Sequence, residues 1–206
     1  MFDTEVNRQW INSVLQDLYD RSSRFRSFIA IRSQDDFYSA KNQLMKMGNT
    51  SYYLDCGATK AVIIDDSNKD FVIKIPFSGL EEDYCEKEVE HYEAAQEYNV
   101  PGLFAAIEYI EEWRGAPIYL QEYIRGIGAE AEFKTLDSIE SSRNSDYYYG
   151  EDDEAIYDAI EIQYSLETFD NFRSLVDDYG INDFHFGNVG YRDGRIVFVD
   201  YSGYFE

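Results

Sequence analysis

The chain has 206 residues, enough for one domain or two small lobes with a hydrophobic core. Its formal net charge of −23 argues against nucleic acid as a partner, because the phosphates would be repelled. The two cysteines make no disulfide framework and suit a reducing cytoplasm. The apolar runs are too short to span a membrane and the N-terminus has no signal-peptide pattern, so we expect a cytoplasmic protein with no membrane partner.

The first 48 residues predict a helical extension. Apolar residues recur at helical spacing within residues 5–19, which predicts an amphipathic helix. The run beginning at Ser33 resembles a capping box, with Asp in the place of Glu, and predicts a second helix that continues to Met47. No Pro/Gly/Ser-rich linker follows, so we expect the extension to pack on a lobe rather than form a separate binding module.

Three short apolar runs separated by polar turns predict three strands within residues 52–75. The loop between the first two contains Gly57, which can take a positive φ or approach a phosphate closely. Thr59 and Lys60 beside it could add a hydroxyl or a charge. Lys74 stands inside the third apolar run, where an ammonium group is costly to bury unless it meets anions. The alternative is that Lys74 reaches solvent from an edge strand.

Residues 81–98 predict a helix, because acidic residues crowd the first turns, Gly and Pro are missing, and Pro101 follows the end. Apolar residues at helical spacing, among them Tyr92, suggest the face turned to the sheet. Glu88 precedes Tyr92 by one helical repeat, so it could pair with Lys74, whereas the glutamates on either side would point elsewhere.

Two further apolar runs, 105–110 and 118–124, flank a Gly/Pro turn and predict a β-hairpin. Beyond it, residues 144–172 are rich in acids and contain neither Lys nor Arg. This segment is an ordinary solvated loop and helix face, a docking surface for a basic protein, or a cradle for a cationic substrate such as an amine. A helix from about residue 164 to 179 should lead into the next motif.

The most informative stretch lies near the C-terminus. Asp183 is followed by Asn188, and Asp200 closes an apolar β-run. Mg²⁺ prefers oxygen ligands, so Asn188 and Asp200 could hold it against the phosphates of ATP. Asp183 could then accept or orient the proton of an attacking hydroxyl. His185 would brace this loop by hydrogen bonding.

The run D-F-H-F-G-N, followed by V-F-V-D, is similar to the catalytic loop and metal-binding aspartate of the protein-kinase-like superfamily. It looks closer to the D-x-H-x-G-N form of aminoglycoside and choline kinases than to the H-R-D of protein kinases. The resemblance covers roughly residues 50–206. It implies an α+β bilobal fold, with an antiparallel N-lobe sheet and helix αC at 49–124. A shortened helical C-lobe with the acidic insertion would follow at 125–206.

The resemblance also implies residue roles. Lys74 would hold the α- and β-phosphates of the nucleotide, and Glu88 would position Lys74. Gln121 would be the gatekeeper, and backbone groups of Glu122 and Ile124 would meet the adenine. In the phosphate-covering loop, Gly57 stands alone where the family has three glycines.

We therefore expect an ATP- and Mg²⁺-dependent phosphotransferase that acts on a hydroxyl of a small molecule or protein. The chain continues for few residues beyond Asp200 and lacks the activation segment with which protein kinases bind peptides. The missing activation segment argues more strongly against phosphorylation of proteins than against binding of a nucleotide. The alternative is a pseudokinase-like binding protein that inhibits or scaffolds a basic partner through the acidic segment.

Overall fold

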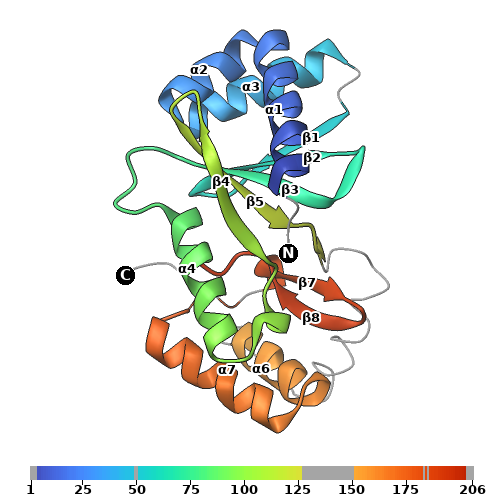
Figure 1. Cartoon of the computed structure of the whole chain (residues 1–206), viewed down its shortest axis with the longest axis vertical. Coiled ribbons are helices and arrows are strands. Elements are labelled where there is room, and N and C mark those ends of the chain that lie inside the picture. Colours follow the sequence, from blue (N-terminus) through green and yellow to red (C-terminus); the bar gives the residue numbers. More distant parts are fainter. Residues whose placement is uncertain (1–3, 49–50, 127–150, 183, 185, 203–206) are drawn as a thin grey trace. The chain divides into compact units, whose positions relative to one another are not determined.

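The computed structural model describes residues 4–48, 51–126, 151–182, 184 and 186–202 of the chain. In this part the protein is α+β, with a five-stranded antiparallel sheet and six α-helices (Figure 1). The predicted α+β class and five-stranded antiparallel sheet are confirmed. The chain divides into two compact units, one made of Met1–Val89 and Ile107–Tyr123, the other of Glu90–Ala106 and Ile124–Glu206.

The five-stranded sheet belongs to the first unit and has the order β1-β2-β3-β5-β4. Its strands are β1 (Tyr52–Cys56), β2 (Lys60–Asp65), β3 (Asn68–Pro76), β4 (Ile107–Trp113) and β5 (Ala116–Glu122). A tight turn at Arg114 and Gly115 joins β4 to β5, with φ values of +53° and +82°. Positive φ at both central residues gives a turn whose twist matches that of the flanking strands.

Three helices cover one face of this sheet: α1 (Thr4–Arg21), α2 (Ser23–Ile31) and α3 (Gln34–Met47). They share a hydrophobic core with strand residues such as Ile63, Ile73 and Ile118. The helices contribute Ile11, Val14, Leu15, Leu18, Phe25, Phe28, Ile29, Phe37, Ala40 and Leu44. The N-terminal extension therefore packs on the sheet, as expected, and both fall within one compact unit.

Serine side chains fix where two of these helices begin. The Oγ of Ser33 accepts the N–H of Asp36 at 3.1 Å, so the predicted cap and the helix that ends at Met47 are both present. The Oγ of Ser22 accepts the N–H of Phe25 at 3.0 Å and starts α2, a helix that the sequence analysis did not predict.

A hydrogen bond ties α1 to strand β2. The indole Nε1–H of Trp10 donates to Oδ2 of Asp65 at 2.8 Å. Asp65 also accepts the backbone N–H of Ser67 at 2.9 Å and its hydroxyl at 2.6 Å. Burial acts to raise the pKa of Asp65, but the hydrogen bonds from Ser67 and Trp10 outweigh it and lower the pKa. The carboxylate is therefore held in its charged form.

The face of the sheet opposite α1–α3 carries buried polar side chains. In the ladders, Lys74 of β3 lies opposite Val62 on one side and Tyr119 on the other. Because side chains alternate along a strand, Lys60 and Gln121 project from the same face as these three residues. Lys74, which the sequence placed inside an apolar strand, is therefore on this face of the sheet.

The second unit has a three-stranded antiparallel sheet with the order β6-β7-β8. Its strands are β6 (Arg125–Gly126), β7 (Val189–Arg192) and β8 (Arg195–Phe198), and its helices are α6 (Glu151–Gln163) and α7 (Leu166–Tyr179). Short 3₁₀ turns span Pro101–Leu103 and Phe186–Asn188. Helix α4 (Tyr84–Glu97) begins in the first unit and ends in the second. Helix α7 agrees with the helix predicted at 164–179, whereas the three-stranded sheet was not predicted.

Aromatic rings form the centre of the second unit. Phe172 of α7 stacks on Phe198 of β8, with ring centroids 5.5 Å apart and an angle of 10° between the planes. Phe184 lies 5.1 Å from Phe198 and 5.7 Å from Tyr157 of α6. Phe104 joins the same cluster through Phe198, at 5.5 Å. These contacts connect the two helices with the small sheet.

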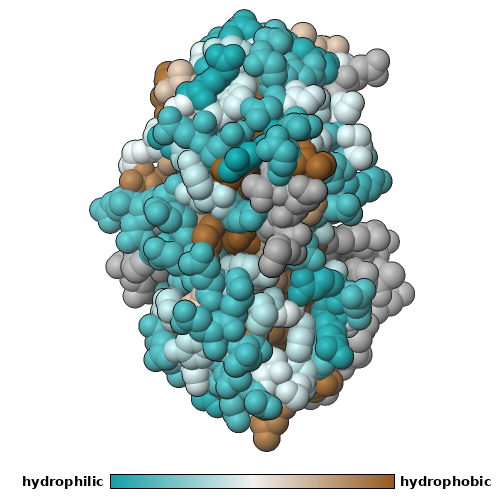
Figure 2. All heavy atoms as spheres, in the orientation of Figure 1, coloured by the Kyte–Doolittle hydropathy of each residue, from teal (hydrophilic) through white to brown (hydrophobic). Residues whose placement is uncertain are grey.

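Hydrophilic side chains dominate the face seen in Figure 2, in keeping with a chain in which 29% of residues are charged. Among the residues that the structure describes, no helix has both the length and the apolar composition to cross a membrane. Helix α6 starts at the acidic run 151–154. The side chains of that run, and the acidic segment before it, lie outside the described residues.

Candidate functional site

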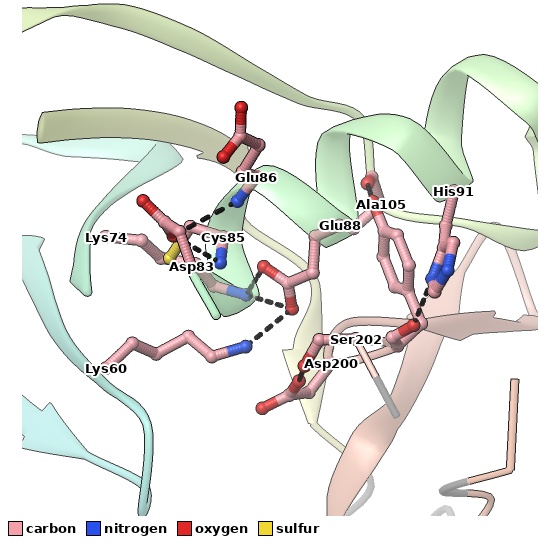
Figure 3. A network of polar contacts seen from close by, with 11 residues as sticks. Lys60, Lys74, Asp83, Cys85, Glu86, Glu88, His91, Ala105, Asp200 and Ser202 are labelled. Carbon is pink, nitrogen blue, oxygen red and sulfur yellow. Dashed lines mark hydrogen bonds and ion pairs between the residues drawn. The ribbon is translucent and has the colours of Figure 1, made fainter. Parts of the chain in front are cut away.

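Lys74 and Glu88 form a buried ion pair in the first unit (Figure 3). The Nζ of Lys74 lies 3.0 Å from Oε1 and 2.9 Å from Oε2 of Glu88, which stands on α4. Lys74 is 4% exposed and Glu88 is fully buried. The predicted pairing is therefore present, and the edge-strand alternative is wrong, because β3 is the central strand of the sheet. The neighbouring Glu86 and Glu90 are exposed, as expected.

The start of α4 is fixed by Asp83. Its Oδ1 accepts two backbone N–H groups of the first helical turn, at 2.9 and 3.2 Å, as an N-terminal cap does. The hydroxyl of Tyr119 donates to Oδ2 of Asp83 at 2.9 Å. Because Tyr119 lies directly opposite Lys74 in the β3–β5 ladder, the strand pair that places Lys74 also holds the helix that carries Glu88.

A second lysine, Lys60, shares the carboxylate of Glu88. Its Nζ lies 2.9 Å from Oε1, the same oxygen that Lys74 contacts, and its side chain is 2% exposed. From the sequence, Lys60 was expected only to add a charge beside Gly57. Lys60 reaches Glu88 because of the strand register: Lys60 stands two residues before Val62, on the same face of β2, and Val62 lies directly opposite Lys74. The sequence contained evidence for this position, because Lys60 begins an apolar strand and is two residues away from Val62.

Two lysine side chains and one carboxylate thus meet at a single buried position. Buried charges persist in proteins when they are paired and hydrogen-bonded, as these are. Burial raises the pKa of the nearby Cys85 thiol well above its usual range, so this thiol stays protonated at neutral pH. Burial, together with the negative charge of Asp83, likewise raises the pKa of Tyr119, whose hydroxyl keeps the proton that it donates.

Asn188 and Asp200 lie next to each other in the second unit. The backbone C=O of Asn188 accepts the N–H groups of Val199 at 2.8 Å and Asp200 at 3.4 Å. These bonds close the base of the β7–β8 hairpin, whose tight turn at Asp193 and Gly194 has φ values of +54° and +77°. The hairpin explains why two residues well separated in sequence meet.

The chain after Asp200 is anchored by Tyr201, which is 1% exposed. The hydroxyl of Tyr201 donates to the C=O of Ala105 at 2.6 Å, and its own C=O accepts from Nδ1 of His91 at 2.7 Å (Figure 3). The hydroxyl of Ser202 donates to Oδ1 of Asp200 at 3.2 Å. The half-buried carboxylate of Asp200 is thus presented from a fixed backbone.

The side chains of Asn188 and Asp200 suit a Mg²⁺ ion in their chemistry. An amide oxygen and a carboxylate oxygen are hard donors, and Mg²⁺ is commonly held by one or two such groups together with waters and phosphate oxygens. Within the described part of the chain, His, Cys, Asp and Glu form no group of three that could hold a metal by themselves. The two oxygen donors are of the chemical type that suits an ion whose other ligands are waters and phosphate oxygens.

Asp183 and His185, the other polar residues of the predicted catalytic loop, lie outside the described residues, and their roles remain predictions. Phe184, between them in sequence, is 6% exposed. Its ring packs 5.8 Å from Phe172 of α7 and 5.1 Å from Phe198 of β8. This point of the chain is therefore fixed to the aromatic core of the second unit.

The remaining predicted nucleotide contacts follow strands of the first unit. Gly57 comes directly after β1; its φ is not positive, and a Cβ atom there would meet none of the described residues within 4 Å. Glu122 is the last residue of β5, and Ile124 is 7% exposed. Gln121 is 2% exposed, and its Nε2 has no hydrogen-bond partner among the residues that the structure describes. Because Gln121 shares a sheet face with Lys74, this face has an amide donor two positions along from the ion pair.

Comparison of the chain with protein-family models, with curated proteins and with solved structures found no match. The first unit offers two buried ammonium groups on one carboxylate. The second offers an amide and a carboxylate at the base of one hairpin.

Proposed function

We propose that the chain is a kinase-like phosphotransferase that uses ATP and Mg²⁺ and acts on a hydroxyl of a small molecule or protein. The buried ion pair between Lys74 and Glu88 supports this most strongly. In protein kinases a strand lysine holds the nucleotide phosphates and a helix glutamate positions that lysine. Here β3 and α4 supply the same two residue types in contact. A bilobal kinase-like fold is part of the proposal.

Each unit carries one part of the proposed residue set. Lys74 would hold the phosphates through its ammonium group, and Glu88 would keep that group in place. Asn188 and Asp200 would bind Mg²⁺, and Asp183 would orient the acceptor hydroxyl. When bound, ATP with Mg²⁺ supplies the phosphoryl group and offsets its negative charge. Backbone groups of the β5 end and of the residues after it would meet the adenine.

The net charge of −23 bears on the acceptor. A strongly negative chain attracts cations and repels anions over distances of about 10 Å at moderate salt. A cationic acceptor, such as an amine that also carries a hydroxyl, would therefore be favoured. Nucleic acid would be disfavoured for the same reason.

The test compares two Asp→Asn substitutions in one hairpin. Asp200→Asn removes a proposed Mg²⁺ ligand, whereas Asp193→Asn makes the same change in the exposed turn and keeps a residue that tolerates positive φ. We expect Asp200→Asn to abolish Mg²⁺-dependent turnover of labelled ATP with its melting temperature little changed. Asp193→Asn should turn over ATP like the wild type.

Ligand-induced stabilisation gives an independent measurement. A nucleotide present at a hundredfold its Kd stabilises the folded state by about 2.7 kcal/mol, which a melting experiment detects readily. Unchanged melting with millimolar ATP, ADP or GTP, together with no turnover by the wild type, would refute the proposal. That result would favour the alternative of an acidic binding protein that scaffolds a basic partner.

A further inference from the structure

We infer that the junction between α2 and α3 positions the two loops that lead to the Lys74–Glu88 pair, so that the N-terminal helices shape the proposed site as well as the fold. The junction spans residues 31–34. One loop, residues 57–59, joins β1 to β2, and the other, residues 77–83, joins β3 to α4. The inference rests on the proposed function for its consequence, which is that the junction sets the affinity for ATP.

Two hydrogen bonds join the junction to the loop before α4. The backbone N–H of Ser78 donates to the C=O of Arg32 at 2.9 Å, and the hydroxyl of Ser78 donates to the C=O of Ile31. The ring of Phe77, which is 6% exposed, packs against one phenylalanine of α2 and one of α3, with centroids 6.2 and 6.4 Å away. This loop is therefore fixed to both helices at its first two residues.

A third hydrogen bond joins the junction to the loop between β1 and β2. The Nε2 of Gln34, the first residue of α3, donates to the C=O of Gly57 at 2.9 Å. Lys41 stands two helical turns further along α3 and pairs with Asp55 of β1 at 3.2 Å, so the same side of the helix contacts this part of the chain twice. Within the loop, the N–H of Gly57 donates to the C=O of Lys60 at 3.2 Å. The loop is thus held by α3 and by its own turn.

The two loops are also joined to each other. The N–H of Phe77 donates to the C=O of Thr59 at 2.9 Å. The junction and the two loops therefore form a closed ring of hydrogen bonds, in which each part is bonded to the other two. Contacts in such a network support one another and can be worth more than separate bonds.

This ring stands where the elements that carry the charged side chains begin. Lys60 follows the first loop directly, and its Nζ lies 2.9 Å from Oε1 of Glu88. The second loop ends at Asp83, the cap of α4, and Glu88 stands in the second turn of that helix. A displacement of either loop would therefore move one partner of a buried contact. The junction is in a position to hold both partners at once.

The backbone of the junction is itself restricted. Arg32 has φ +55° and ψ +39°, the left-handed conformation that glycine usually supplies at the end of a helix. A residue with a side chain has fewer alternative conformations than glycine, which makes the junction stiffer. The conformation occurs where the C=O groups of Ile31 and Arg32 meet Ser78. Unfavourable backbone conformations that neighbouring contacts maintain are typical of functional regions.

A double variant of the full chain, Gln34→Ala with Ser78→Ala, tests the inference because it removes both side-chain donors of the ring. The control, Gln9→Ala with Ser174→Ala, removes an amide donor and a hydroxyl donor at exposed positions of α1 and α7. In hydrogen–deuterium exchange without nucleotide, we expect amides of residues 57–60 and 77–88 to exchange about tenfold faster in the junction variant than in the control.

Steady-state kinetics with ATP supplies a readout that a purely structural role would not change. The looser loops must be ordered when ATP binds, and this cost reduces affinity. We expect the KM for ATP to rise about tenfold in the junction variant, with kcat within about twofold of the control. The urea midpoint followed by tryptophan fluorescence should match that of the control.

The outcomes separate this inference from the proposed function. Exchange equal to that of the control overturns the inference, and so does exchange that rises evenly over the first unit with an equal loss of stability. An unchanged KM in a chain that turns over ATP overturns the inference and leaves the phosphotransferase standing. Locally faster exchange in a chain that neither binds nor turns over ATP rejects the phosphotransferase and keeps the role of the junction in holding the loops. If the double variant does not fold, Gln34→Ala alone decides between these results.

Discussion

Among single substitutions of Lys60, Lys74 and Glu88, the change of Glu88 to Gln should destabilise the first unit most. Glu88 is fully buried and accepts one hydrogen bond from Lys60 and two from Lys74. Glutamine has nearly the same shape, but it leaves two buried ammonium groups without their shared negative charge. Removing one partner of a buried ion pair costs about 3–5 kcal/mol. We expect a loss of this size in the free energy of unfolding.

The assay is urea unfolding followed by tryptophan fluorescence. The two tryptophans of the chain, Trp10 and Trp113, both belong to the first unit and both pack with its core. The fluorescence therefore reports the unit that contains Glu88. Glu86→Gln is the control, since it makes the same chemical change on the same helix at an exposed position within the first unit. Its effect should stay within about 0.5 kcal/mol.

A second substitution separates charge from shape. In the Glu88→Gln background, Lys60→Met removes one of the two ammonium groups and should recover part of the lost stability. In the wild-type background the same Lys60→Met change should cost less than Glu88→Gln, because Lys74 and Glu88 remain paired. A loss below about 1 kcal/mol for Glu88→Gln, or no recovery in the double variant, would refute the view that Glu88 neutralises buried charge.

Two further predictions concern other parts of the first unit. Trp10→Phe removes a hydrogen bond to the charged Asp65 and should cost about 1.5–3 kcal/mol near neutral pH in urea unfolding. Because the bonds from Ser67 and Trp10 lower the pKa of Asp65, its contribution is present above the ordinary value of 3.8 and is lost as the pH falls below it. The wild type and Trp10→Phe should therefore converge in acid, and a constant difference would contradict this. Burial raises the pKa of the Cys85 thiol from an ordinary value of 9.0, so at pH 8 a thiol reagent should label only half-buried Cys56 in the native chain and both cysteines in urea. The native Cys56→Ser variant should stay unlabelled, and above pH 9 stability should fall, because only the unfolded chain ionises the thiol.

Features set by neighbours in sequence could be predicted. Ser33 lies just before a helical run, and its side chain caps that helix in the structure. The contact between Lys74 and Glu88 could also be predicted, because strand alternation and the helical repeat each fix the direction of one side chain. Helix α2 was not predicted, although Phe25, Phe28 and Ile29 stand at helical spacing, because a helix of nine residues shows this spacing over little more than one turn.

Features set by register between distant strands could not be predicted. The contact of Lys60 with Glu88 requires that Val62 face Lys74 across the β2–β3 hairpin. A slip of one residue would turn Lys60 to the opposite face of the sheet, and the apolar pattern alone does not fix the register. The same holds for the bond between Tyr119 and Asp83, which depends on the pairing of β3 with β5.

The packing of the three N-terminal helices has a consequence for any attempt to dissect the chain. A fragment that began at β1 would keep every strand of the five-stranded sheet but would uncover the side that α1–α3 protect. Residues such as Ile63, Ile73 and Ile118, all fully buried here, would then form a contiguous apolar surface in water. Surfaces of this kind associate with one another. The three helices therefore protect the protein against aggregation, and expression of the five-stranded sheet without them should yield an insoluble product.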